Sequence, residues 1–247
     1  MFKLQYIKSC SILFLILSYT SCKKDSWCTE CFERTGKIVT VKRSLSPFNQ
    51  LVVNDNLNVF ITQDSVFDVE IEAGENMMYL IKTDVNDSIL TIQNKNKCNW
   101  TRSFKKPFNI YIKMPQVKYI TSLTSGNIKS LNTLTGYKLE IEINGAGDVE
   151  LTVNNTTITS SAKNGGNLIL HGNLYSHVCT MQSPSFLYCK DLVTSYTLLE
   201  TYTSGLCYIN VTNKFDCEIE NIGDVYCYGS PTILNKTGNG KGTLYSE

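Results

Sequence analysis

The sequence predicts an all-β fold, a β-solenoid over residues 116–247 preceded by an antiparallel β region over residues 37–115. Three observations support this class. Short segments alternate apolar and polar residues, as strands with one buried face do. In the second region these segments recur about every 19 residues, which is the spacing of a repeated coil. The segments also lack the i, i+3, i+4 spacing of apolar residues that marks an amphipathic helix.

Residues 1–21 have the composition of an export signal, with Lys3 and Lys8 before an apolar run at residues 11–17. That run is too short for a membrane-spanning helix, which needs ~20 residues. The next residues, Tyr19-Thr20-Ser21-Cys22, resemble a bacterial lipobox, in which the cysteine is diacylated and becomes the new N-terminus. We therefore expect a lipoprotein signal peptide, lipid on Cys22 as the membrane anchor, and a tether over residues 22–36. An ordinary secretory signal that ends near a cysteine is the alternative.

The charge balance gives no reason to expect a nucleic-acid partner. The formal net charge is +1, and removal of Lys3 and Lys8 with the signal leaves 21 basic and 22 acidic side chains, or −1. Proteins that bind nucleic acid through its phosphates need a basic surface. The short basic run of Arg102, Lys105 and Lys106 is interpreted as a solvated loop.

The region over residues 37–115 contains strand-like segments without a regular repeat. Alternation is clear at residues 51–53, 57–61, 67–71, 88–92 and 108–112, with Asn and Asp at the turns between them. Pro115 follows the last segment and is expected to end that strand. We expect an antiparallel arrangement that caps the first coil of the solenoid.

The repeats are aligned by the last small residue before each alternating run. These markers are 21, 19, 19, 20, 18 and 19 residues apart, and they are Gly126, Gly147, Gly166, Ser185, Gly205, Gly223 and Gly242. Each unit has two short strands that cannot bury an apolar face alone, so stacking at about 4.8 Å is expected to build one continuous interior. Glycine suits the corner because it adopts a positive φ without a Cβ clash.

Equivalent positions of the units have matching chemistry. Apolar side chains stand two residues after the marker, at Ile128, Val149, Leu168, Leu187, Cys207, Val225 and Leu244. A second inward set stands four after it, with serine only at the two ends, and a third stands six before it, at Ile141, Ser160, Cys179, Leu199 and Cys217. Polar residues in the terminal units fit the caps that solenoids need.

An outward row of tyrosines is the candidate binding surface. Three residues after the marker stand Lys129, Glu150, Ile169, Tyr188, Tyr208, Tyr226 and Tyr245, and Tyr228 lies near them. Stacked coils would align Tyr188, Tyr208, Tyr226 and Tyr245 into a flat amphipathic strip able to hold a glycan chain or the edge of a protein. The alternative is a ladder that serves stability alone, because tyrosine favours strands and pairs with itself across them.

Five of the ten cysteines fall on inward positions of the solenoid. Cys179 and Cys217 share a column but are separated by Leu199, which puts them about 9.6 Å apart, beyond the reach of a disulfide. Buried free thiols are the favoured state, with cross-lumen pairs such as Cys217 with Cys207 or Cys227 left open. In Cys28-Thr29-Glu30-Cys31 we prefer a structural disulfide, local or to Cys98, over a zinc or redox site.

Nothing in the sequence points to catalysis, a metal or a cofactor. His171 and His177 stand beside no nucleophile motif, and phosphate-binding glycine loops are missing. The outward glutamates, which a polysaccharide-cleaving enzyme would need in a cleft, are interpreted as a solvated face; they are Glu140, Glu142, Glu200, Glu218 and Glu220. Two triplets, Asp64-Ser65-Val66 and Asp87-Ser88-Ile89, resemble a bacterial periplasmic O-glycosylation acceptor.

Several ordered motifs resemble one family. In the first region they are Phe48-Asn49-Gln50-Leu51, Asn58-Val59-Phe60-Ile61 and Ile110-Tyr111-Ile112-Lys113-Met114-Pro115, and in the second Gly145-Ala146-Gly147-Asp148-Val149 and Gly223-Asp224-Val225-Tyr226. Together, over residues 37–245, they resemble the putative auto-transporter adhesin head domain, or GIN domain, of bacterial envelope lipoproteins. The departure is Gln182-Ser183-Pro184-Ser185-Phe186, which lacks the glycine-rich corner. The resemblance implies a solenoid-like fold and an adhesive role, and it supplies no catalytic residues.

The sequence thus predicts a non-enzymatic, lipid-anchored protein of the bacterial cell envelope, facing the periplasm or the exterior, whose solenoid binds a glycan or a surface protein. A structural or stress-linked envelope component without a ligand is one alternative. A carbohydrate-active β-helix enzyme is the other.

Overall fold

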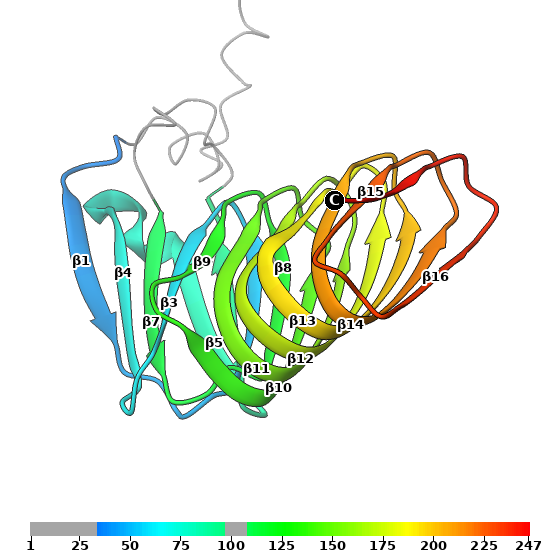
Figure 1. Cartoon of the computed structure of the whole chain (residues 1–247). Coiled ribbons are helices and arrows are strands. Elements are labelled where there is room, and N and C mark those ends of the chain that lie inside the picture. Colours follow the sequence, from blue (N-terminus) through cyan, green and yellow to red (C-terminus); the bar gives the residue numbers. More distant parts are fainter. Residues whose placement is uncertain (1–33, 97–107) are drawn as a thin grey trace, which may run out of the picture.

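The computed structural model describes residues 34–96 and 108–247, which form a row of stacked coils (Figure 1). Within these residues, 17 strands join into one sheet that folds back on itself as two columns enclosing the core. A short 3₁₀-helix, η1 (Glu75–Leu80), lies at the N-terminal end, with Met77 and Met78 buried. The predicted β-solenoid is therefore confirmed.

The two columns share four long, bent strands. Column A contains, in spatial order, β5 (Ile81–Asn86), β6 (Ile89–Asn94), β2 (Gln50–Asp55), β8 (Tyr119–Thr124), β10 (Leu134–Ile143), the second halves of β11 (Val149–Ala162), β12 (Leu168–Gln182), β13 (Leu187–Tyr202) and β14 (Cys207–Ile219), and β16 (Ile233–Thr237). Column B contains β1 (Ile38–Arg43), β4 (Asp68–Gly74), β7 (Asn109–Met114), β3 (Asn58–Gln63), β9 (Ile128–Ser130), the first halves of β11 to β14, β15 (Val225–Tyr228) and β17 (Leu244–Ser246).

The register between coils is the one that the repeat predicts. Val149 pairs with Ile128 on one side and Leu168 on the other, and the same inward column continues through Leu187, Cys207, Val225 and Leu244. The column six residues before the marker is also continuous, from Ile141 through Ser160, Cys179 and Leu199 to Cys217. Inward side chains are buried and outward ones are not, as strands with one core face require.

The first region differs from the expected antiparallel arrangement. β1 pairs antiparallel with β4, β4 with β7, and β5 with β6. However, β2 lies parallel to β6 and β8, and β3 lies parallel to β7 and β9. Residues 50–63 thus form a complete coil inserted between two later ones. Parallel neighbours need a long connection, and here Val59 pairs with Ile128, 69 residues further on. No 19-residue period can reveal a neighbour so distant in the chain.

The corner glycines serve close packing, not a positive φ. Positive φ values occur at Gly36, Gly165, Gly172, Gly229 and Gly238, none of which is a marker. At Gly147 an added Cβ would instead overlap the carbonyl oxygen of Gly126 in the preceding coil, and at Gly223 it would overlap that of Gly205. The corners therefore sit directly on one another, and the reason expected from the sequence for these glycines is wrong.

Five free cysteines lie buried in the solenoid core: Cys179, Cys189, Cys207, Cys217 and Cys227. This agrees with the expectation of free thiols packed as small apolar side chains. Burial raises the pKa of the Cys179, Cys207 and Cys217 thiols to about 12, so these side chains stay protonated and unreactive at neutral pH.

The C-terminal end of the stack is polar. All five residues of β16 are exposed, and Lys236 stands in register with Cys217, a position that faces the core in the preceding coil. The Lys236 ammonium donates a hydrogen bond to the carbonyl oxygen of Gly242, 3.2 Å away. A charged side chain thus closes the lumen at the last coil.

Candidate functional site

Four tyrosines form a ladder on the outer face of column B. Tyr188, Tyr208, Tyr226 and Tyr245 pair in register from β13 through β14 and β15 to β17. Successive ring centroids are 5.7, 5.2 and 4.9 Å apart, and neighbouring ring planes differ by only 13–18°. These four side chains are called the tyrosine ladder below. The structure thus aligns the residues that the sequence singled out.

The ladder is half open to solvent. Tyr188 and Tyr245 are 39% and 42% exposed, while Tyr208 and Tyr226 are half-buried between their neighbours. Desolvation, with the nearby Asp224 carboxylate as a smaller cause, raises the pKa of the Tyr226 hydroxyl, so it stays neutral and can donate and accept hydrogen bonds.

The same outward column continues to the N-terminal end of the molecule. Phe60 on β3 and Tyr111 on β7 occupy it with ring centroids 5.1 Å apart, and Lys129 and Glu150 form an ion pair between them and the ladder. Sequence reasoning missed this aromatic pair because β3 and β7 lie outside the 19-residue period. The available signal was the pattern of Asn followed by apolar, aromatic and apolar residues, which both segments share and which the ladder coil at residues 224–227 repeats with Asp in place of Asn.

A polar ladder runs beside it, one residue after each corner. Asn58 accepts a hydrogen bond from the backbone N–H of Asn127, Asn127 from Asp148, Asp148 from Asn167, and Asn167 from Phe186. Phe186 ends this series, and its ring instead stacks on Tyr188 at 6.1 Å. At the coil that begins near residue 185 aromatic stacking therefore replaces the polar hydrogen bond between coils, which returns only where Asp224 accepts one from the backbone N–H of Thr243.

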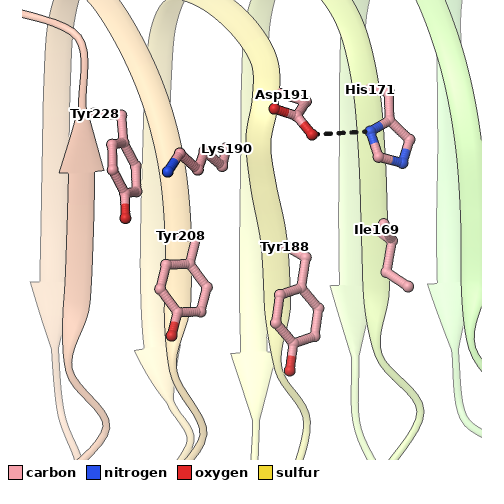
Figure 2. A pocket seen from close by; sticks show the side chains of 7 residues that line it. All are labelled: Ile169, His171, Tyr188, Lys190, Asp191, Tyr208 and Tyr228. Atoms are coloured by element: carbon pink, nitrogen blue, oxygen red, sulfur yellow. Dashed lines mark ion pairs between the residues drawn. The ribbon is translucent and has the colours of Figure 1, made fainter.

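A groove of about 370 Å³ opens beside the start of the tyrosine ladder. It is lined by Ile169, His171, Tyr188, Lys190, Asp191, Tyr208 and Tyr228 (Figure 2). In this view Ile169, Tyr188 and Tyr208 form one row, with the broad faces of both tyrosine rings visible. His171, Asp191, Lys190 and Tyr228 form a second row, so an apolar side faces a polar one.

The groove arises from a bulge in β13. Cys189 pairs with Ile209, yet Val193 pairs with Asn210, so residues 190–192 have no counterpart in β14, whereas on the other side Leu192 pairs with Gly172 of β12. A bulge bends its strand and redirects side chains. Here Leu192 turns into the core, and Lys190 and Asp191 are exposed on the rim. Only the 20-residue spacing of this coil hinted at the extra length.

The two charged residues of the bulge point in opposite directions. Asp191 reaches toward His171, with an Oδ2 to Nδ1 distance of 3.6 Å, and Lys190 reaches toward Tyr228, with its ammonium 4.2 Å from the ring centroid (Figure 2). His171 also lies 3.9 Å from the Glu150 carboxylate. Lys190 has no ion-pair partner within residues 34–96 and 108–247.

His177, unlike His171, is sealed in the core. Its Nε2 lies 2.9 Å from the Ser160 hydroxyl, and its Nδ1 has no partner in the described part of the chain. Burial lowers the pKa of His177 to about 4, so the ring is neutral at physiological pH. A substrate has no route to this pair, whose role is packing.

The glutamates considered for catalysis lie on the outer face of column A. Glu142 accepts hydrogen bonds from Asn144 and Tyr119, Glu140 pairs with Lys138, and Glu200 accepts one from Thr180. A second groove of about 710 Å³ on this face is bordered by Glu218. Within the residues described, His, Cys, Asp and Glu side chains form no cluster of three or more suited to a metal ion.

Some predicted features lie outside the described residues. They are the signal over residues 1–21, the lipidation site Cys22, most of the tether, the basic run, and Cys28, Cys31 and Cys98. Ser65 and Ser88 of the two glycosylation-like triplets are exposed, between β3 and β4 and between β5 and β6. Among the described residues, no helix has the length and apolar character to cross a membrane.

Comparison with known proteins gives one family and several similar folds. The family model described as "putative auto-transporter adhesin, head GIN domain" matches residues 47–231. The crystal structure of a putative adhesin from Bacteroides fragilis is similar with a TM-score of 0.80 and 23% identity, covering 85% of this chain and 97% of that chain. No curated protein matches.

Two further structures have the same fold. A putative adhesin from Parabacteroides merdae has a TM-score of 0.66 at 16% identity, covering 87% of this chain and 98% of that one. A protein from Parabacteroides distasonis, described as a putative lipid binding protein, has a TM-score of 0.65 at 17% identity, covering 86% and 97%. At these identities the likeness concerns the fold alone.

Proposed function

Since the chain belongs to the family of the putative auto-transporter adhesin head GIN domain, we propose that it is a lipid-anchored adhesin of the cell envelope that holds a glycan on the tyrosine ladder. The observation that carries the proposal is the ladder itself, four nearly parallel rings beside a groove with polar groups along one side. Membership of an adhesin family supports a non-enzymatic role at the cell envelope or surface.

The ladder has the chemistry of a carbohydrate-binding surface. Tyrosine offers a large apolar face together with a hydroxyl that donates and accepts hydrogen bonds, and both are needed to hold a sugar ring. The coils are rigid and repeat every ~4.8 Å, so the ladder presents similar contacts at regular intervals to a polymer laid along it. A protein edge is the alternative occupant, because tyrosine is also enriched in protein interfaces.

The ladder is tested by changing Tyr208 and Tyr226 together to serine. Cross-strand aromatic pairs are worth about 0.5–1.5 kcal/mol each, so we expect the melting temperature to fall by only a few degrees. Glycan-array binding, measured well below that temperature, is expected to disappear. Tyr137 and Tyr175, 74% and 66% exposed, supply the matched control, and their serine variants should bind as the unchanged chain does.

Two results would contradict this role. If the folded double variant binds glycans as the unchanged chain does, the tyrosine ladder contributes to stability only and is not the binding surface. Failure of the unchanged chain to bind any glycan on the array would favour a structural envelope component without a ligand.

The lipid anchor is tested at Cys22. We expect Cys22→Ser to prevent diacylation and so to move the protein from the membrane fraction to the soluble fraction of its native cells. Acyl chains contribute about 0.8 kcal/mol per buried methylene group, which makes the diacylated form stay with the membrane. Mass spectrometry should find the acyl mass on the N-terminal residue of the unchanged protein only. A serine variant that remains in the membrane fraction would disprove the anchor.

A further inference from the structure

The coil over residues 183–202 departs from its neighbours in two ways that meet at the groove. The polar ladder is interrupted there, because Phe186 replaces the Asn or Asp of the preceding coils, and β13 bulges at residues 190–192. Bulges that redirect side chains occur preferentially at functional sites. A coil without this bulge would form no groove here. The irregular coil is therefore the part of the surface that provides charged groups beside the tyrosines.

Lys190 is the charged group that this irregularity presents to a ligand. Its ammonium lies against the Tyr228 ring, without an ion pair in the described residues. An ammonium held over a ring by cation–π attraction is kept in place while its N–H donors remain available. Lys190 therefore offers a positioned positive charge at one end of the groove.

The opposite end of the groove is arranged differently. Asp191 is turned away from Lys190 and faces His171, so its carboxylate does not neutralise the Lys190 ammonium (Figure 2). Asp191 oxygens that do not face His171 can accept hydrogen bonds from hydroxyl groups. The groove thus combines a cation at the Tyr228 end and acceptors at the His171 end of its polar side with an apolar side of Tyr188 and Tyr208 opposite.

From this arrangement we propose that the groove binds an acidic sugar unit of a polysaccharide, with the anionic group on Lys190, the ring on Tyr188 and Tyr208, and hydroxyls on Asp191. The assignment rests on the proposed function, which it narrows from glycans in general to glycans that carry carboxylate or sulfate. A hydrogen bond from an ammonium to an anionic oxygen is stronger than a neutral one and gives the site its selectivity.

The test compares two polymers that differ only in charge. Polygalacturonate carries a carboxylate on each sugar, and its fully methyl-esterified form is neutral. The purified chain is expected to bind polygalacturonate more tightly, and Lys190→Gln is expected to weaken that binding about tenfold, as loss of a charged hydrogen bond does. Binding of the methyl ester should not respond to Lys190→Gln. Raised salt should weaken only the charged interaction.

Three further variants distinguish the effect of the Lys190 charge on binding from effects of misfolding and of lost aromatic contact. Lys190→Arg keeps the charge and the ring contact, and it should retain binding within about threefold. Lys82→Gln removes an exposed lysine on β5, at the far end of column A, and should change nothing. Tyr208→Ser should weaken the binding of both polymers, since the aromatic side of the groove contacts both.

Dextran sulfate and dextran repeat the comparison with sulfate as the acidic group. Loss of binding in Lys190→Gln with either acidic polymer supports the proposal and identifies the group. Equal binding of acidic and neutral polymers, unaffected by Lys190→Gln, overturns the acidic-sugar assignment and leaves a glycan adhesin. Capture of a deglycosylated protein ligand, with none of the four polymers bound, overturns the glycan function and this inference together.

Discussion

Gly147→Ala is expected to destabilise the solenoid by about 3 kcal/mol or more, the upper range of overpacking in a close-packed interior. The added methyl group would overlap the carbonyl oxygen of Gly126 and lie 2.6 Å from its carbon. Both atoms belong to the backbone, so no side chain can rotate away. The coils must separate at this corner, which weakens the hydrogen bonds on both sides. Chemical denaturation of the purified chain measures the loss.

A second glycine provides the control. At Gly136 in β10 an added Cβ meets nothing closer than 3.4 Å, and the backbone φ is not positive there. Gly136→Ala is therefore expected to be neutral or slightly stabilising, because alanine restricts the unfolded chain. If both variants unfold at the same denaturant concentration, close stacking of the corners is not what requires glycine at position 147.

Acidification is expected to destabilise the protein through His177. The unfolded chain takes up a proton at this residue near pH 6.5, whereas burial lowers the pKa of the folded state to about 4. Between these values the unfolded state binds more protons, so stability falls as the pH falls. The stability that neutral His177 contributes is present above pH 6.5 and is lost progressively toward pH 4, by about 3 kcal/mol in all.

The measurement is the free energy of unfolding from pH 7.5 to pH 4 for the unchanged chain and for His177→Gln. The variant lacks the titrating ring, so its stability should fall less over this interval by about 3 kcal/mol. At pH 7.5 it should be less stable, because the Ser160 hydroxyl loses the ring nitrogen 2.9 Å away. His171→Gln, on the outer face, should keep the steep fall. Parallel pH profiles for all three proteins would refute the assignment.

The periodic part of the fold is predictable because each coil buries the same positions. Val149, Leu168 and Val225 could be aligned from spacing alone, and the structure stacks them in one column. The inserted coil of β2 and β3 could not be aligned in this way, since its neighbours are paired across 69 residues. Spacing carries information only about neighbours that follow one another in the chain.

The candidate site was predictable in part for the same reason. Tyr188, Tyr208, Tyr226 and Tyr245 are equivalent positions of successive coils, so their alignment follows from the repeat. The groove depends instead on where the extra residues of β13 are accommodated, and a strand can absorb added length at several points. Lys190 and Asp191 therefore drew no attention in the sequence, although they define the polar side of the site.

Lys236 has a consequence for how molecules of this protein meet. An exposed strand at the end of a stack is a template on which another chain can add, and repetition of that step produces fibres. A second chain that paired with β16 would enclose the Lys236 ammonium in an apolar lumen. Without a compensating anion, this burial of a charge costs several kcal/mol. Lys236 thus opposes the addition of another chain on β16, and with it the growth of a filament from this strand.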